Sequence, residues 1–131
     1  MEVPTSEGVY QIRCAPGGMP IRVNRIMGPD PDGILYIGQS ERLRSRIRTF
    51  WRAAKSDIRS TRTPHPPHSG GITYAVCRYA EKFPLDGLQV RWAQVKDSKH
   101  IEGGLLAWYV EKFIDGPPLN LNLNRKYYSL G

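Results

Sequence analysis

The chain has few cysteines and no long apolar run, and both shortages limit what it can be. Its 131 residues include only two cysteines, Cys14 and Cys77. Isolated cysteines of this kind form neither a disulfide framework nor a C-x-x-C motif, so we expect free thiols in a reducing compartment, the cytoplasm. No apolar stretch approaches the roughly 18 residues of a membrane span. The N-terminus lacks the basic and apolar regions of a signal peptide, and we therefore expect no membrane partner.

Acidic residues are also scarce. The sequence has 12 Asp and Glu against 19 Lys and Arg, which gives a formal net charge of +7. This surplus suits a phosphate-rich partner, because Lys and Arg gain affinity by releasing counterions from nucleic acid. Basicity alone does not identify the partner, since net charge also serves solubility. The length indicates a single domain, residues 1–131, around one hydrophobic core.

Three segments have the patterns of β-strands. Residues 9–14 and 88–95 alternate apolar and polar side chains, the period of a half-buried strand. Residues 34–37 are apolar and β-prone, which predicts a more central strand. The long connection 15–33 opens and closes with Gly and Pro turn clusters, and its middle, 21–25, is a candidate edge strand.

Three further segments, 41–56, 72–83 and 98–114, are predicted to be helices. Residues 72–83 include β-prone types, but apolar side chains recur on one helical face and Pro84 follows as a natural stop. That face would comprise Ile72, Val76, Tyr79 and Phe83. Residues 60–71 are rich in Pro, Ser, Thr and Gly and are predicted to form a loop.

The helix 41–56 carries its basic residues in two sets. Its apolar side chains form one stripe, made of Leu43, Ile47, Phe50, Trp51 and Ala54. Four basic residues are predicted on the solvent side, namely Arg44, Arg48, Arg52 and Lys55. Arg42 and Arg46 instead line one edge of the stripe. An arginine at that boundary can direct its guanidinium group into a cleft.

Glu102 is the most informative acidic residue. The helical period places it near the middle of the apolar face of residues 98–114, which consists of Leu105, Leu106, Tyr109, Val110 and Phe113. A carboxylate there needs a partner or a cleft, because burying it unpaired is costly. The alternative is that Glu102 only complements the helix dipole in the first turn. Glu111 falls on the opposite, exposed face.

Four elements of the chain occur in a recognisable order. They are Gly8-Val9-Tyr10, then Tyr36-Ile37-Gly38 with Arg46 ten residues after Tyr36, then Glu102 in a helix, and Asn120 after Pro118-Leu119. Their order and spacing resemble those of the GIY-YIG nuclease family. The resemblance covers residues 8–120. It implies an α/β (α+β) fold with a small antiparallel sheet of about three strands flanked by helices.

The resemblance also implies an activity, the metal-dependent endonucleolytic hydrolysis of phosphodiester bonds in nucleic acid, with DNA expected ahead of RNA. Glu102 would hold one Mg²⁺, with Mn²⁺ as the alternative, since such an ion keeps most of its waters. Arg46 would neutralise the scissile phosphate and stabilise charge in the transition state. Tyr10 or Tyr36 would take a proton from the attacking water. Which tyrosine does so stays open, and a phenol with a pKa near 10 would need help from a cation such as Arg46.

Other residues are assigned supporting roles. Gly8 is expected to serve backbone geometry, and Gly38 to let a substrate phosphate approach the strand end. Asn120 is expected to order the site through hydrogen bonds, although a plain turn asparagine is an equal alternative. The expected nucleic-acid contacts on the basic helix are Arg42, Arg44, Arg48, Arg52 and Lys55.

Two positions depart from the family pattern. Phe50 lies four residues beyond Arg46, where some members have a tyrosine or histidine, and Gln39 stands where repair-type members have a lysine. His68, before a Ser-Gly-Gly sequence taken as flexible, is a candidate to supply the missing polar group, with a pKa suited to proton transfer. The alternative is an exposed loop histidine. The departures also keep a second class of protein open, a non-catalytic nucleic-acid-binding module that retains the fold and the basic helix.

Overall fold

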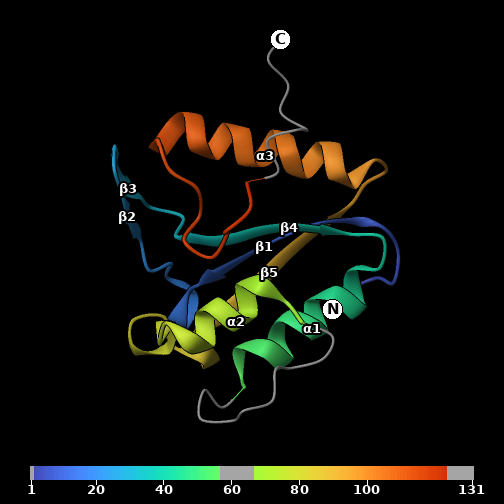
Figure 1. Cartoon of the computed structure of the whole chain (residues 1–131). Coiled ribbons are helices and arrows are strands. Elements are labelled where there is room, and N and C mark those ends of the chain that lie inside the picture. Colours follow the sequence, from blue (N-terminus) through green and yellow to red (C-terminus); the bar gives the residue numbers. More distant parts are fainter. Residues whose placement is uncertain (1, 57–66, 124–131) are drawn as a thin grey trace.

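The computed structural model describes residues 2–56 and 67–123. A mixed α+β arrangement is seen, in which α3 lies on one face of a β-sheet and α1 and α2 lie on the other (Figure 1). The strands are β1 (Gly8–Cys14), β2 (Val23–Arg25), β3 (Gly28–Asp30), β4 (Ile34–Ser40) and β5 (Leu88–Gln94). The α-helices are α1 (Leu43–Ala54), α2 (Ser69–Val76) and α3 (Ser98–Phe113), and short 3₁₀ turns lie at Pro16–Gly18, Tyr79–Glu81 and Leu85–Gly87. No helix in these two stretches is long and apolar enough to cross a membrane.

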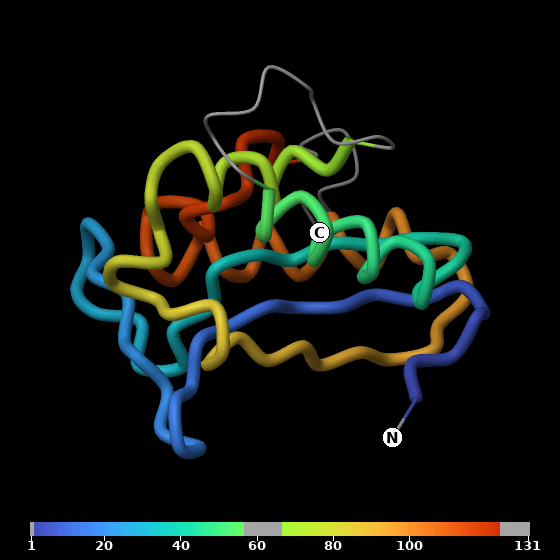
Figure 2. Tube along the Cα trace, turned by 90° about the horizontal axis from the view of Figure 1, so that it is seen from below, coloured from blue at the N-terminus to red at the C-terminus, as the bar shows by residue number. Residues whose placement is uncertain are grey.

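The main sheet has three antiparallel strands in the order β4-β1-β5, so the expected sheet is confirmed. Figure 2 shows β1 running between β4 and β5, with β5 at the edge of the sheet opposite β4. In the register, Tyr10 is opposite Gly38 and Ile12 is opposite Tyr36. Residues two apart on a strand share a face, so the pairing places the Tyr10 and Tyr36 side chains diagonally on the same face.

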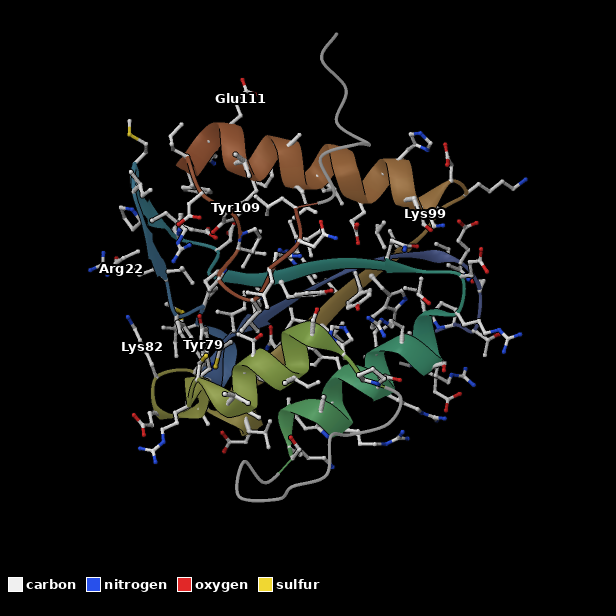
Figure 3. The ribbon with its side chains drawn as sticks, in the orientation of Figure 1. Arg22, Tyr79, Lys82, Lys99, Tyr109 and Glu111 are labelled. Carbon is white, nitrogen blue, oxygen red and sulfur yellow. The ribbon has the colours of Figure 1, made fainter. Side chains whose placement is uncertain are left out.

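Each face of the sheet has its own apolar layer. On one side, Ile34 and Ile37 of β4 pack with Leu106, Tyr109 and Phe113 of α3. In Figure 3, Tyr109 lies beneath α3 toward the sheet, whereas Glu111 points away from it. On the other side, a second layer combines strand residues with side chains from α1 and α2, among them Tyr10, Ile12, Tyr36, Leu43, Phe50 and Tyr74. The catalytic candidates on β1 and β4 therefore face α1 and α2.

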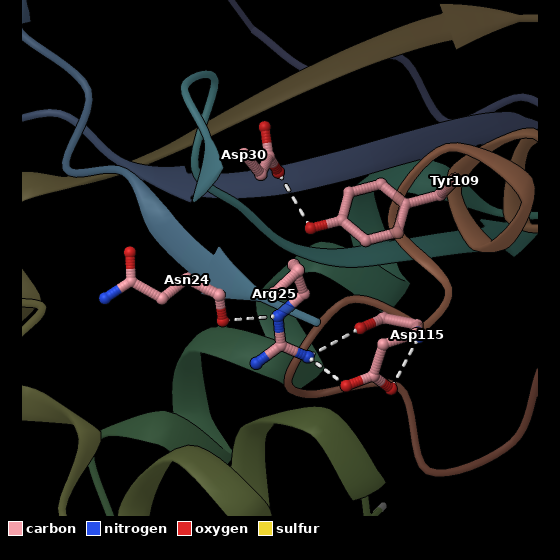
Figure 4. Close-up of polar contacts among 6 residues, drawn as sticks. Asn24, Arg25, Asp30, Tyr109 and Asp115 are labelled. Atoms are coloured by element: carbon pink, nitrogen blue, oxygen red, sulfur yellow. Dashed lines mark hydrogen bonds and ion pairs between the residues drawn. The ribbon is translucent and has the colours of Figure 1, made fainter. Parts of the chain in front are cut away.

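The strands β2 and β3 form a separate two-stranded sheet. Arg25 Nη1 donates to Asp115 Oδ2 at 2.9 Å and to the Gly116 carbonyl at 3.0 Å (Figure 4). The buried Asp30 carboxylate accepts from the Tyr109 hydroxyl at 2.8 Å and from the Ile34 backbone N–H at 3.0 Å. These bonds attach the hairpin to α3 and to the start of β4. The candidate strand at 21–25 is confirmed over Val23–Arg25, and it pairs with the Gly-Pro-Asp sequence that follows rather than with the main sheet.

The start of α2 also differs from the expectation. The predicted loop 60–71 falls partly on residues 57–66, outside the described residues, but Ser69, Gly70 and Gly71 form the first turn of α2. The buried residues of α2 are Gly70, Gly71 and Tyr74, and Val76 is 61% exposed. A Cβ on Gly71 would lie 2.6 Å from the Phe50 carbonyl oxygen and 2.7 Å from the Ala53 Cβ. The glycines thus permit α2 to pack closely on α1, rather than providing a hinge.

Candidate active site

A polar cleft of about 620 Å³ opens where the end of β4, the first half of α1 and the start of α3 meet. Its lining includes Tyr36, Gln39 and Ser40 from β4, Arg46 and Thr49 from α1, and Lys99 and Glu102 from α3. Three residues that the sequence singled out for separate reasons, Tyr36, Arg46 and Glu102, thus share one cleft. A base, a cation and a carboxylate around one open space can act on a phosphodiester.

The two tyrosines occupy different depths. Their ring centroids are 5.9 Å apart. Tyr36 is 9% exposed and lines the cleft, whereas Tyr10 is 2% exposed and does not. Gly38 provides the space for Tyr10, because a Cβ on Gly38 would lie 2.6 Å from the Tyr10 ring. The tyrosine rings fill the space on this face that Gly38 leaves open, and the approach of a substrate phosphate to the strand end stays a prediction.

Burial dominates the acidity of both phenols. Burial raises the pKa of Tyr10 well above its ordinary value of 10.0, and the neighbouring Tyr36 raises it further. Burial likewise raises the pKa of Tyr36. The Arg46 guanidinium opposes the rise in both pKa values through its charge and hydrogen bonding. Both tyrosines are therefore neutral phenols at neutral pH, and Arg46 is the cation that favours loss of a proton from either.

His68 lies behind this cleft, fully buried. It is the N-cap of α2, where its Nδ1 accepts from the Gly71 backbone N–H at 3.3 Å, and its Nε2 is 2.8 Å from the Tyr10 hydroxyl. Its ring is also edge-on to Phe50, with centroids 5.2 Å apart. The exposed-loop alternative was wrong, and His68 does occupy the space beside Phe50.

The same burial changes what His68 can do. Desolvation, followed by the charge of Arg46, lowers the pKa of His68 from 6.5 to about 3. The imidazole is therefore neutral throughout the neutral range. The expectation of a histidine with a pKa suited to proton transfer was wrong, because a buried ring beside an arginine resists protonation.

Arg46 is held between α1 and the segment before α2. Its Nη1 donates to the Pro67 carbonyl at 3.2 Å, and the side chain is half-buried at the cleft. The predicted boundary position on α1 is confirmed. A guanidinium has five donors in a fixed fork, so the bond to Pro67 orients Arg46 and leaves further donors for a phosphate.

Glu102 is half-buried in the first half of α3. The described part of the chain holds no group of three or more His, Cys, Asp or Glu that could bind a metal ion together. Glu102 shares this open polar cleft with Gln39 and Ser40, and such a lining fits a hard ion such as Mg²⁺, which keeps several waters and takes one or two protein oxygens. It would not suit Zn²⁺, which normally takes three or four protein ligands.

Asn120 binds the backbone of β4 directly. Its Oδ1 accepts from the Ile37 N–H at 2.9 Å, and its Nδ2 donates to the Ile37 carbonyl at 2.9 Å. The neighbouring Leu119 N–H donates to the Leu35 carbonyl at 2.9 Å. The expected ordering role of Asn120 is confirmed, since these bonds fix the strand that carries Tyr36.

Gly8 also has a packing role. A Cβ there would meet the Ala93 carbonyl oxygen and the Leu43 Cδ1. Its missing side chain therefore lets β1 approach both β5 and α1 closely, at the strand that carries Tyr10.

Three of the four basic residues predicted on the solvent side of α1 are placed as expected, since Arg48, Arg52 and Lys55 are exposed. Arg42, predicted beside Arg46 at the edge of the apolar stripe, is also exposed and lines the cleft. Arg44 is half-buried, because its Nε donates to the Val3 carbonyl at 2.7 Å and its guanidinium lies 3.7 Å from Glu2. Placing Arg44 in open solvent was wrong, since the helical period says nothing of the N-terminal segment that packs beside α1.

Sequence reasoning missed Lys99, a further cation in the cleft besides Arg42 and Arg46. Lys99 precedes Glu102 by three residues, and residues three apart lie on one side of a helix, so the position of Glu102 could have revealed it. Gln39, the second departure, accepts from the Ser98 hydroxyl at 2.9 Å, and Glu7 accepts from the same serine.

Comparisons of the chain with protein-family models, with curated proteins and with solved structures gave no match.

Proposed function

We propose that the chain is a metal-dependent endonuclease of the GIY-YIG type that hydrolyses phosphodiester bonds in nucleic acid, DNA in the first place. The observation that carries the proposal is the convergence of Tyr36, Arg46 and Glu102 on one open polar cleft. These side chains come from β4, α1 and α3. A surplus of seven positive charges supports a phosphate-rich substrate.

In this proposal Tyr36 is the proton acceptor for the attacking water, because it lines the cleft and Tyr10 does not. It accepts the proton as a phenolate, after its own hydroxyl proton has passed to solvent, since a protonated phenol has no place for a second proton. Arg46, oriented by the Pro67 carbonyl, contacts the scissile phosphate and offsets the negative charge that develops there. The same guanidinium favours the ionised form of Tyr36. Tyr10 and His68 act behind Tyr36 as positioning residues.

Glu102 would hold the metal ion, with Gln39 and Ser40 beside it. When bound, such an ion acts as a Lewis acid that offsets charge on a phosphoryl oxygen. Lys99 adds a further positive charge to the lining of the cleft, besides Arg42 and Arg46. Its role is to attract and hold the negatively charged strand.

The test is incubation of the purified chain with supercoiled plasmid, in parallel with Mg²⁺ and with EDTA. The proposal predicts conversion to open-circular and linear DNA with Mg²⁺ and none with EDTA. Nicking of equal extent in both would contradict metal dependence.

The second candidate is a non-catalytic nucleic-acid-binding module. It is favoured by Phe50, which cannot exchange a proton, and by the neutral, buried His68 beside it. Salt-sensitive binding of DNA without any nicking in Mg²⁺ or Mn²⁺ would select this candidate.

A further inference from the structure

The catalytic cleft continues into two further hollows along α1. The first has a volume of about 530 Å³ and is lined by Thr5, Arg42, Arg44, Ser45 and Arg48. It shares Arg42 and Ser45 with the cleft. Three arginines around one hollow make a site for a phosphate group. A strand whose scissile phosphate lies at Arg46 would therefore meet a second phosphate site next to it.

The second hollow, of about 260 Å³, has a different chemistry. It shares Arg48 with the arginine-lined hollow, but Ile47 and Trp51 of α1 and Leu88 and Val90 of β5 form much of its wall. It lies between α1 and the edge strand β5, since residues of both line it. Its volume is below the roughly 300 Å³ at which pockets for drug-sized ligands begin, so it suits one flat ring.

We propose that this apolar hollow, at Trp51, binds one unstacked nucleobase of the strand whose phosphates lie on Arg42, Arg44 and Arg48. This inference rests on the proposed function and narrows its substrate to nucleic acid that is single-stranded or locally unpaired at this point. In a duplex the flat faces of the bases are covered by their neighbours, so a base enters an apolar hollow only after it leaves the stack. An indole beside a phosphate site is the arrangement that binds single strands without sequence preference.

The chain contains a close match for Trp51 on the opposite side of the sheet. Trp51 is 38% exposed and has the Lys55 ammonium 5.8 Å from its ring centroid. Trp108 of α3 is 47% exposed and has the Lys112 ammonium 5.4 Å from its ring centroid. Both are helical tryptophans with a lysine four residues later, but only Trp51 adjoins the arginine-lined hollow. Trp108→Ala is therefore the control for Trp51→Ala.

The experiment measures fluorescence anisotropy of a labelled single-stranded oligothymidylate, in EDTA so that the strand is not cut. Trp51→Ala is expected to raise Kd roughly tenfold, the scale of one lost base–aromatic stack. Trp108→Ala is expected to leave Kd unchanged. Trp51→Phe keeps an aromatic ring, and it is therefore expected to raise Kd less than Trp51→Ala does. A strand of abasic residues should bind wild type and Trp51→Ala equally, because it offers phosphates but no bases.

Several outcomes overturn the inference while leaving the proposed function intact. The first is a Kd for the oligothymidylate that Trp51→Ala leaves unchanged. The second is a rise in Kd in Trp108→Ala as large as that in Trp51→Ala. The third is a rise in Kd of Trp51→Ala for the abasic strand as large as that for the oligothymidylate. Failure of the wild type to bind the oligothymidylate would overturn the inference, and failure to nick plasmid with Mg²⁺ as well would overturn the proposed function with it. Plasmid nicking, measured separately, distinguishes the two kinds of failure, because it does not depend on the oligothymidylate.

Discussion

His68 is held by two hydrogen bonds that fix the position of its ring proton. Nδ1 accepts from the Gly71 N–H, so in the neutral ring the proton is on Nε2. Nε2 therefore donates to the Tyr10 hydroxyl oxygen, 2.8 Å away. The hydroxyl proton of Tyr10 therefore points away from His68. The His68 N–H holds the phenol oxygen from the side away from the cleft. We infer that His68 positions Tyr10 and, through ring contact 5.0 Å between centroids, Tyr36.

The buried His68 predicts how stability changes with pH. Its pKa is about 3 in the folded chain and 6.5 in the unfolded chain, so the unfolded state binds more protons between these values. The stability from the neutral ring is fully present above pH 6.5 and is lost as pH falls toward 3, by at most about 1.4 kcal/mol per pH unit. The free energy of unfolding of wild type and of His68→Gln, measured by urea denaturation, should therefore converge as pH falls below 6.5. Parallel curves would show that His68 is protonated in the fold.

Replacing Arg46 and replacing Arg48, two residues apart on α1, should affect different steps. Arg46 lines the cleft beside Tyr36, whereas Arg48 is exposed and lines the two outer hollows. Arg46→Ala should lower the cleavage rate at saturating DNA by roughly 10² to 10³, the scale of one lost transition-state donor. Arg48→Ala should mainly weaken binding and reduce the slope of log K against log salt by about 1. If Arg46→Ala and Arg48→Ala weakened DNA binding equally and left the cleavage rate unchanged, the two arginines would not differ in role.

At the scale of elements, the site depends on the segment after α3. Asn120 forms two hydrogen bonds with the backbone of Ile37 and so holds β4 next to Tyr36. Asn120→Asp keeps the acceptor but replaces the donating amide with an oxygen that faces the Ile37 carbonyl. We expect a loss of about 1 to 3 kcal/mol in the free energy of unfolding, measured by urea denaturation. Asn24→Ala, at the exposed position of β2, is the control and should change stability little.

The helix α2 shows which elements the sequence could not predict. The strands 9–14 and 88–95 and the helix 98–114 follow from periodicity, and the structure confirms them within one or two residues. Ser69-Gly70-Gly71 has the composition of a loop, but a Cβ on Gly70 would lie 2.8 Å from the Tyr36 ring. Glycine is required there by tertiary packing, which no local pattern records. His68 was identified as a candidate, yet its burial depends on the same packing.

At the scale of the whole molecule, the site exists only when the sheet and both helical layers are assembled. Tyr36 and Arg46 could be linked by their spacing, but Glu102 comes from the other side of the sheet, on α3. The two outer hollows escaped sequence reasoning because they depend on how α1 lies against β5 and the N-terminal segment. Charge and helical period predict the basic helix, whereas tertiary packing determines which of its arginines face the cleft.

Replacement of Glu102 tests the central claim most directly. Glu111 on the exposed face of α3 provides the matched control, since both changes remove one carboxylate from the same helix. With Mg²⁺ and supercoiled plasmid, Glu102→Gln should abolish nicking while binding labelled DNA as wild type does, and Glu111→Gln should nick at the wild-type rate. Nicking by Glu102→Gln at the wild-type rate would contradict the account, because the carboxylate proposed to hold the metal ion would then be dispensable.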